Sequence, residues 1–147
     1  MVGKSRRFAV ADTAQQIVGG FLLAGPFVVT EEVWVLAARM TVGHLAAVVT
    51  IVFAIGYGAL YKADDDRDPD SEQEVAGIPL RFLSLMCVAF GSVTVLALAF
   101  TAPRTFLVEG EILAAPTPTL VALTTVKAVA VGAIFSVVGA ATADSVF

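Results

Sequence analysis

Four long apolar segments alternate with shorter polar stretches along the chain. The segments cover about residues 9–29, 33–61, 78–100 and 118–143. Each is long enough to cross the hydrocarbon core of a bilayer, which takes about 20 residues of α-helix. The pattern therefore predicts an all-α integral membrane bundle of four transmembrane helices, built by residues 1–147 as a single transmembrane domain.

The composition agrees with a membrane protein. Hydrophobic residues make up 58% of the chain, charged residues make up 15%, and the mean hydropathy is +0.88. A soluble domain has about 45–50% apolar residues. The net charge of −4 gives no basic surface for nucleic acid. We therefore expect the lipid bilayer as a partner and no nucleic acid.

The first apolar segment has a polar face. Asp12, Gln16 and Gly19 recur at steps of three or four, so they share one side of a helix. Polar groups in a membrane helix are costly unless they face protein or water. This side should therefore point into the bundle. Pro26, near the end of the segment, favours a kink or a stop.

Residues 31–40 allow two interpretations. Thr30 is a suitable N-cap, and Glu31 and Glu32 complement the dipole of a helix that starts there. This helix is either the first part of the second span or a separate short interfacial helix between spans one and two. In both cases Trp34 is expected at the membrane interface.

The stretch 62–77 is the most polar part of the chain. It holds seven of the 13 acidic residues and almost nothing apolar, which predicts an acidic solvent loop. Its alternating acids do not form an EF-hand, because Pro69 stands where the turn glycine belongs. In addition, Val75 stands where the closing glutamate belongs.

Small side chains recur on the helix faces that should pack together. In the last segment they repeat every four residues, which is a strong signal for close helix packing. The positions expected at helix–helix contacts are Gly19, Gly20, Gly91, Ala128, Gly132, Ser136 and Ala140. A similar face of the second segment includes His44, Ala47, Ile51 and Ala54. These stripes also favour self-association into a homo-oligomer.

Several residues around the third and fourth spans have ordinary explanations. Arg81 is close enough to the start of its span to extend into the headgroups, and Cys87 is expected to be a small buried packing residue. The linker 101–117 fits a small hairpin or an interfacial loop. Thr117 is a good cap, and Pro118 suits the first position of the fourth helix.

Lysine and arginine residues indicate the orientation. With four spans, the positive residues on one side are Lys4, Arg6, Arg7, Lys62 and Arg67. Arg39 and Arg104 lie on the other side. Positive residues concentrate in cytoplasmic loops, so we expect a multi-pass protein of the cell (plasma) membrane with both termini in the cytoplasm.

Lys127 is the most informative single residue. It lies about nine residues into the fourth span, too deep for its ammonium to reach the headgroups easily, so it should have a partner. Glu31, Glu32 and His44 can lie at or above a similar depth.

We hypothesise a buried ionisable set that lines a polar path. Its candidate members are Asp12, Gln16, Glu31, Glu32, His44 and Lys127. The alternative is that one carboxylate neutralises Lys127 and only fixes the register of the helices, while His44 is an ordinary packing residue.

The motifs of common enzymes are missing from the sequence. It has no HExxH metal pair, no Walker glycine loop and no nucleotide-binding GxGxxG. One histidine and one distant cysteine do not make a zinc site or a catalytic dyad by their spacing. We therefore expect no enzymatic activity, no metal and no cofactor.

The run VGGFLLAGPFVVTEEVW, residues 18–34, resembles an uncharacterised family of small multi-pass integral membrane proteins of haloarchaea and some bacteria. The shared features are a glycine-rich first span, a proline, and then threonine, glutamate and tryptophan. In this chain they are Gly19, Gly20, Pro26, Thr30, Glu31 or Glu32, and Trp34. The other spans agree mainly in hydropathy. The resemblance implies a multi-pass membrane protein and supplies no catalytic residues.

Two functions remain open. The first is a small transport-related protein that moves protons, ions or a small solute along the polar path. The second is a non-transporting structural or accessory membrane protein that acts through helix–helix association.

Overall fold

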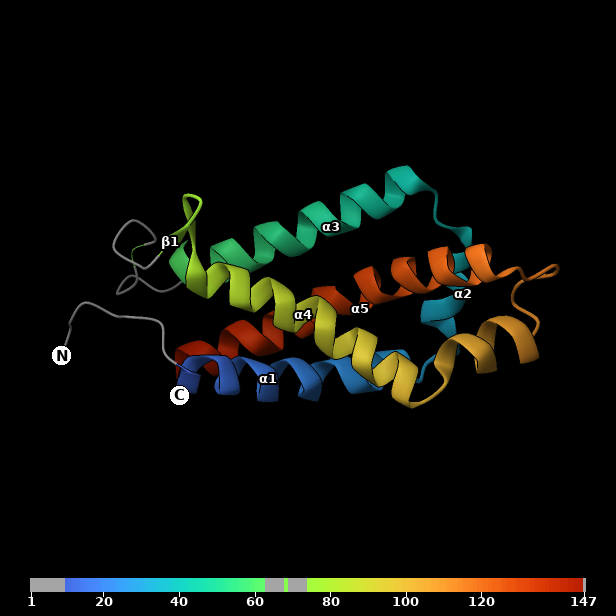
Figure 1. The fold of residues 1–147 in the computed structure, drawn as a ribbon, viewed down its shortest axis with the longest axis horizontal. Helices are drawn as coiled ribbons and strands as arrows, with labels where there is room; N and C mark the ends of the chain where they lie inside the picture. The colour runs from blue at the N-terminus through green and yellow to red at the C-terminus, as the bar shows by residue number, and fades with distance from the viewer. Residues whose placement is uncertain (1–9, 63–67, 69–73, 147) are drawn as a thin grey trace.

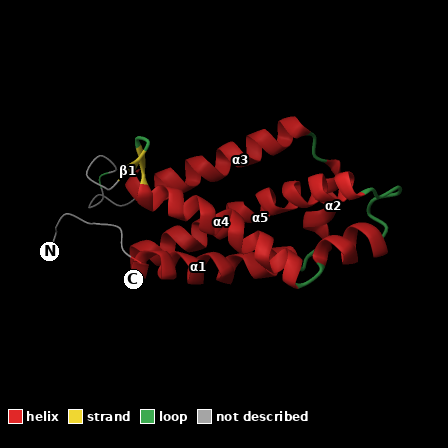
Figure 2. Cartoon of the chain, viewed as in Figure 1, coloured by secondary structure: helices red, strands yellow, loops and turns green. Residues whose placement is uncertain are grey.

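The computed structural model describes residues 10–62, 68 and 74–146. Its helices are α1 (Val10–Val28), α2 (Glu31–Arg39), α3 (Val42–Tyr57), α4 (Leu80–Ala99) and α5 (Pro118–Val146). Two π-helical segments, η1 (Gly58–Lys62) and η3 (Pro103–Glu109), and two short strands, β1 (Glu74–Val75) and β2 (Ile78–Pro79), complete the described chain (Figure 2).

The four long helices form an antiparallel bundle (Figure 1). α1 and α4 run in one direction, and α3 and α5 run in the other. The start of α1, the end of α5 and the β1–β2 hairpin therefore share one end of the bundle, which we call the terminal end. α2 and η3 lie at the opposite end, the α2 end.

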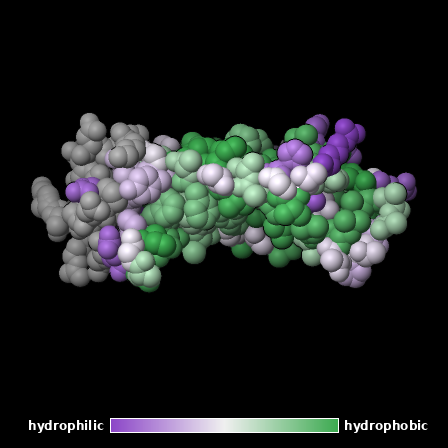
Figure 3. Space-filling model, turned by 90° about the horizontal axis from the view of Figure 1, so that it is seen from above, coloured by the Kyte–Doolittle hydropathy of each residue, from purple (hydrophilic) through white to green (hydrophobic). Residues whose placement is uncertain are grey.

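Among the described residues, three segments are long and apolar enough to cross a membrane alone: Val42–Tyr61, Leu80–Ala99 and Pro118–Ser145. α1 and α2 pass the same test only as a pair, with a bend of 81° between them. The predicted all-α membrane bundle is thus confirmed, with a fourth candidate span that is bent. On the face shown in Figure 3, apolar residues cover the middle, and the hydrophilic residues of the described chain lie mostly toward the ends.

Side chains satisfy the backbone where α1 bends into α2. Pro26 lies inside α1, which continues to Val28. The hydroxyl of Thr30 donates to the carbonyl oxygen of Pro26 at 2.7 Å instead of capping α2. The indole Nε1 of Trp34 donates to the carbonyl oxygen of Val28 at 3.0 Å. Thr30 is thus the N-cap residue of α2, as predicted, but its side chain makes no cap bond. Trp34 is buried in the bundle, with 1% of its surface exposed.

The second span begins at Val42, later than the predicted residue 33. Met40 has extended backbone angles, so α2 ends there and is a separate short helix. Thr41 then starts α3 with a capping box: its hydroxyl accepts from the His44 amide at 3.2 Å, and His44 Nδ1 accepts from the Thr41 amide at 3.1 Å. This cap explains why one continuous helix does not form.

Other boundaries differ less from the prediction. Pro79 is the N-cap of α4, and the Thr117 hydroxyl accepts from the Leu120 amide at 3.1 Å at the start of α5. The 101–117 linker contains the π-helical η3 in place of a hairpin. Much of the predicted acidic loop, residues 63–67 and 69–73, lies outside the described residues.

Helices α1, α4 and α5 build the core, and α3 lies at its side. Only 11% of the most apolar stretch of α3 is buried, against 44% in α4 and 50% in α5. The α3 residues expected to pack on other helices, among them Ala47, Ile51 and Ala54, face outward. Cys87 is also exposed instead of buried. Most of the packing therefore involves α1, α4 and α5, with α3 contributing the buried Val52 and Gly56.

Glycines allow the closest contact, between α1 and α5. A Cβ added at Gly19 or at Gly139 would collide with the carbonyl oxygen of the other residue. Gly20 and Gly132 also contact neighbouring helices, through Ser92 and Val93. Among the other expected packing positions, Ala128, Ser136 and Ala140 are buried. Gly91 differs, because a Cβ there would meet no described atom within 4 Å.

Candidate functional site: a buried ion cluster

Three charged side chains from α1, α4 and α5 meet at the terminal end, and we call them the ion cluster. Arg81 Nη1 donates to both carboxylate oxygens of Asp144, at 2.7 and 2.9 Å. Arg81 Nη2 lies 3.4 Å from a carboxylate oxygen of Asp12. Arg81 and Asp144 are 3% and 4% exposed, whereas the Asp12 side chain is 23% exposed. One guanidinium therefore bridges two carboxylates, of which Asp12 is the more accessible.

An amide and two hydroxyls extend the ion cluster. The fully buried Gln16 places Nε2 3.3 Å from an Asp144 carboxylate oxygen and 3.5 Å from the Arg81 carbonyl oxygen. Its Oε1 accepts from the Ser84 hydroxyl at 2.6 Å. The Thr13 hydroxyl oxygen lies 3.4 Å from that of Ser84. These bonds hold the Gln16 amide so that its Nε2 faces the Asp144 carboxylate.

Arg81 and Asp144 both stand at unfavourable helix ends. Arg81 lies in the first turn of α4, beside the positive end of the helix dipole, and Asp144 lies in the last turn of α5, beside the negative end. Because α4 and α5 are antiparallel, these two ends meet. The pairing of Arg81 with Asp144 offsets what each charge costs alone. The expectation that Arg81 extends into the headgroups is therefore wrong.

Lys127 lies at a different level and has a backbone partner. Its Nζ donates to the carbonyl oxygen of Met40 at 2.6 Å, and the residue is 7% exposed. Met40 follows the last turn of α2, where carbonyl groups lack helical partners and the dipole is negative. The ammonium therefore caps the C-terminus of α2, so the partner is a backbone oxygen and not the expected carboxylate.

The other candidate residues do not join Lys127 in a buried set. Glu31 and Glu32 are exposed in the first turn of α2, and His44 is exposed at the start of α3, where it serves the capping box. The hypothesis of one ionisable set therefore needs correction. The structure assigns Asp12 and Gln16 to the ion cluster, leaves Lys127 as a cap, and turns the remaining three residues outward.

The described core between the ion cluster and Lys127 is mostly apolar. The Ser136 hydroxyl donates to the Gly20 carbonyl oxygen at 3.1 Å. The Ser92 hydroxyl is buried without a hydrogen-bond partner among the described residues. Toward the α2 end follow the apolar residues Ala24, Val93, Ala97, Ala128 and Val129. The part of the chain that the structure describes thus has no continuous polar path.

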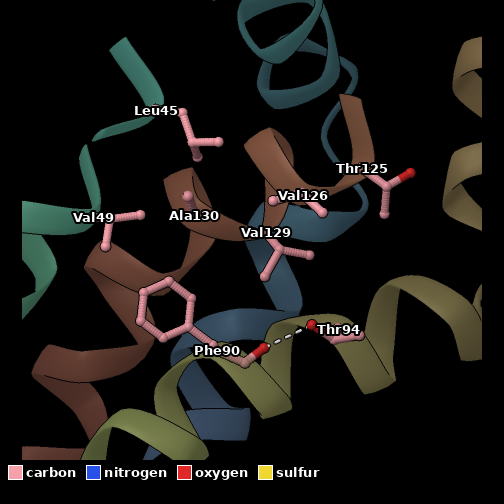
Figure 4. A pocket seen from close by; sticks show the side chains of 8 residues that line it. All are labelled: Leu45, Val49, Phe90, Thr94, Thr125, Val126, Val129 and Ala130. Carbon is pink, nitrogen blue, oxygen red and sulfur yellow. Dashed lines mark hydrogen bonds between the residues drawn. The ribbon is translucent and has the colours of Figure 1, made fainter. Parts of the chain in front are cut away.

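An apolar groove of about 310 Å³ lies between α3, α4 and α5 (Figure 4). Leu45, Val49, Phe90 and Val129 are among its walls. Its two hydroxyls are already engaged within their own helices: Thr94 donates to the Phe90 carbonyl oxygen at 2.8 Å, and Thr125 donates to that of Val121 at 2.7 Å. The side chains of this groove therefore suit a hydrocarbon and not a polar solute.

Comparison with known proteins places this bundle in a family. A family model described as putative integral membrane protein (DUF2391) matches residues 3–143. The chain belongs to this family. The match confirms the expected membership of a multi-pass membrane protein family, and it covers nearly the whole chain. No curated protein and no solved structure matches the chain significantly.

Sequence reasoning missed Asp144, although a signal was present. The stripe of small residues that repeats every four positions runs through Ser136 and Ala140, and Asp144 is its next member. The predicted end of the helix at residue 143 excluded it, whereas α5 continues to Val146. A carboxylate on the most tightly packed face of a membrane helix indicates a buried partner.

Proposed function

We propose that this DUF2391 protein is transport-related and moves protons or a small cation, with the ion cluster as the point where that ion is exchanged. The observation that supports the proposal is that two carboxylates, Asp12 and Asp144, share the guanidinium of Arg81 in the bundle. The proposal includes no enzymatic step and no cofactor.

The helices are also held together by contacts outside the ion cluster. The contact between Gly19 and Gly139 already fixes α1 against α5, and an apolar core surrounds it. Buried ion pairs often contribute no more stability than apolar residues of similar volume. Charges within a membrane are costly and are commonly retained for function. A role in handling ions explains their presence better than packing does.

Asp12 is suited to exchange because it combines exposure with a long contact. A proton or cation that arrives from the water at the terminal end reaches Asp12, whose side chain is 23% exposed. When the Asp12 carboxylate takes up a proton, its attraction to Arg81 at 3.4 Å weakens. Arg81 keeps its two shorter bonds to Asp144. The charge on Asp12 therefore affects one of the contacts between α1 and α4, that of Asp12 with Arg81.

Passage beyond the ion cluster requires helix movement, because the next layers toward the α2 end are apolar. The bend of 81° between α1 and α2 and the small buried share of α3 are the features that permit it. Broken membrane helices with a satisfied backbone at the break are a recurring feature of transporters.

A flux assay tests the proposal. Purified protein in liposomes that contain a pH-sensitive or cation-sensitive dye should dissipate an imposed gradient faster than empty liposomes. Asp12→Asn should abolish this flux while the protein remains folded. Glu31→Gln, at an exposed carboxylate of the α2 end, is the matched control and should leave it unchanged. Equal fluxes for wild type, Asp12→Asn and empty liposomes would reject the transport role.

The alternative function is a structural or accessory role through helix association, including a homo-oligomer. One observation favours it: the outward face of α3 carries small residues such as Ala47 and Ala54, with no described helix packed on it. If this role holds, light scattering in detergent should show an oligomer for the wild type and a lower mass when Ala47 and Ala54 are replaced by leucine, with no flux in any variant. An unchanged molecular mass would argue against association through this face.

The positive residues of the N-terminal segment and the 62–77 loop support a cytoplasmic location of both termini. In a Cys87→Ser background, Asp68→Cys should react with a membrane-impermeant maleimide only in inverted vesicles. Labelling in intact cells would show that the loop lies outside the cell, opposite to the proposed orientation.

A further inference from the structure

Another pocket, of about 340 Å³, lies at the terminal end between α3, the start of α4 and the β1–β2 hairpin. Its walls include Phe53, Tyr57, Glu74, Ile78, Pro79 and Phe82. It shares no residue with the ion cluster. We call it the aromatic pocket.

Three rings form a corner of the aromatic pocket. The rings of Phe53 and Tyr57 lie 5.9 and 5.8 Å from that of Phe82, with interplanar angles of 77° and 71°. Phe82 is 9% exposed, whereas Phe53 and Tyr57 are 44% and 38% exposed. The edge-to-face contacts with Phe82 hold Phe53 and Tyr57 in place while part of each of these two rings stays exposed. Aromatic ring faces attract organic cations.

The hairpin adds a carboxylate to this corner. Glu74 pairs with Pro79 in the strand register, directly before α4. The turn between the strands has positive φ at Ala76 (55°) and Gly77 (83°), as in the tight hairpin turns that match strand twist. None of the ion pairs formed by the described residues involves Glu74.

The surrounding sequence strengthens the attraction for cations. Glu74 is the last of seven acidic residues in the stretch 62–77, which holds only two basic residues, Lys62 and Arg67. Clustered charge of one sign raises the local concentration of counter-ions. Aromatic side chains at the ends of membrane helices commonly anchor a protein at the interface, but anchoring does not require a carboxylate beside the rings.

We propose that the aromatic pocket binds an alkylated ammonium group, carried either by a free organic cation or by a lipid headgroup. Ring faces attract a cation whose charge is spread over methyl groups, and Glu74 supplies the opposite charge. The location beside the first turn of α4 puts the pocket at headgroup level, where both sources are within reach. This inference is independent of the transport role.

Ligand-observed NMR on the full chain in detergent tests the proposal with tetramethylammonium as the probe. Binding in the millimolar range is expected, and it should weaken about five- to tenfold in Glu74→Gln and in Tyr57→Leu, the equivalent of losing one cation–π or ionic contact. The uncharged 3,3-dimethylbutan-1-ol should not compete. The matched controls are Glu31→Gln and Phe100→Leu, which alter an exposed carboxylate and an exposed ring at the α2 end and should bind the probe normally.

Nanodiscs distinguish the two sources of the ammonium group. If tetramethylammonium binds in phosphatidylglycerol nanodiscs but not in phosphatidylcholine nanodiscs, the lipid headgroup occupies the pocket. Equal binding in both identifies a free organic cation. Each result supports the proposal.

The proposal is overturned if the uncharged alcohol binds as well as the cation. It is also overturned if Glu74→Gln and Tyr57→Leu, shown by circular dichroism to be folded, bind the probe as wild type does. Phe53→Leu provides an independent variant if either of these two fails to fold.

Discussion

Replacing Asp144 by asparagine keeps the shape of the side chain but removes the charge that accepts two bonds from Arg81, at 2.7 and 2.9 Å. Both residues are at most 4% exposed, so the guanidinium stays buried without its closest counter-charge. Breaking such a pair costs about 3–5 kcal/mol. Asp12→Asn weakens the contact of 3.4 Å with Arg81, from a side chain that is 23% exposed, and exposed ion pairs of this kind contribute about 0–1 kcal/mol.

The double variant Arg81→Met with Asp144→Leu removes both charges together. No buried charge then loses its partner, and only the Asp12 carboxylate, whose side chain is 23% exposed, loses its contact with Arg81. The stability of the double variant should therefore return to within about 1 kcal/mol of wild type or exceed it. Gln16 loses the Asp144 acceptor in this variant but keeps the Arg81 backbone carbonyl oxygen at 3.5 Å and the Ser84 hydroxyl. The rescue therefore separates the cost of an orphaned charge from the contribution of the pair.

Unfolding in mixed detergent micelles, followed by tryptophan fluorescence, measures these differences. Trp34 is the only tryptophan and is buried at the α2 end, so it reports the loss of the bundle and not a local change at the ion cluster. The reasoning is refuted if Asp144→Asn is no less stable than Asp12→Asn. It is equally refuted if the double variant is as unstable as the single one.

Three further variants probe other contacts. Gly139→Ala places a Cβ against the Gly19 carbonyl oxygen and should lower the stability by about 1–3 kcal/mol or more. Gly91→Ala, in open space, should raise the stability by up to about 1 kcal/mol through helix propensity. Thermal unfolding compares the two variants, and equal effects would contradict the close contact. Lys127→Met leaves the Met40 carbonyl oxygen without its donor, which should cost about 1–3 kcal/mol of stability and accelerate hydrogen exchange at the α2–α3 junction. Lys127→Arg should preserve part of the protection. Unchanged exchange in Lys127→Met would argue against the cap. Ala76→Gly removes a non-glycine residue from φ 55° and should stabilise the hairpin by about 1 kcal/mol, seen as slower exchange of the Ile78 amide; faster exchange would show that the turn is not strained.

The periodicity of the sequence was enough to predict the all-α membrane bundle, because apolar runs of membrane length have few other structures available. It also led to α5 and its Thr117 cap, since cap residues and an N1 proline carry a local signal. The interruption at Met40 was only one of two interpretations. It depends on the Thr41–His44 capping box, which involves two polar residues three positions apart within an apolar context.

The pairing of charges was harder to predict. Lys127 required a partner, and its partner is the backbone carbonyl oxygen of Met40. Every residue has such an oxygen, so the sequence does not show which one is the acceptor. Arg81 and Asp144 are 63 positions apart, and each lies close enough to a helix end to be explained by contact with water. Only the antiparallel arrangement of α4 and α5 shows that these two ends coincide.

The packing of α1 against α5 affects how the protein is inserted into the membrane during synthesis. The residues that complete the ion cluster and the glycine contact, Gly139 and Asp144, belong to α5, which the ribosome makes after α1 to α4. Asp12 and Gln16 enter the membrane long before their partners exist. Until α5 arrives, the nascent chain must keep these polar groups near the membrane surface or shielded by the insertion machinery. Quality control that recognises exposed polar groups in the membrane would therefore detect a truncated chain by its first helix.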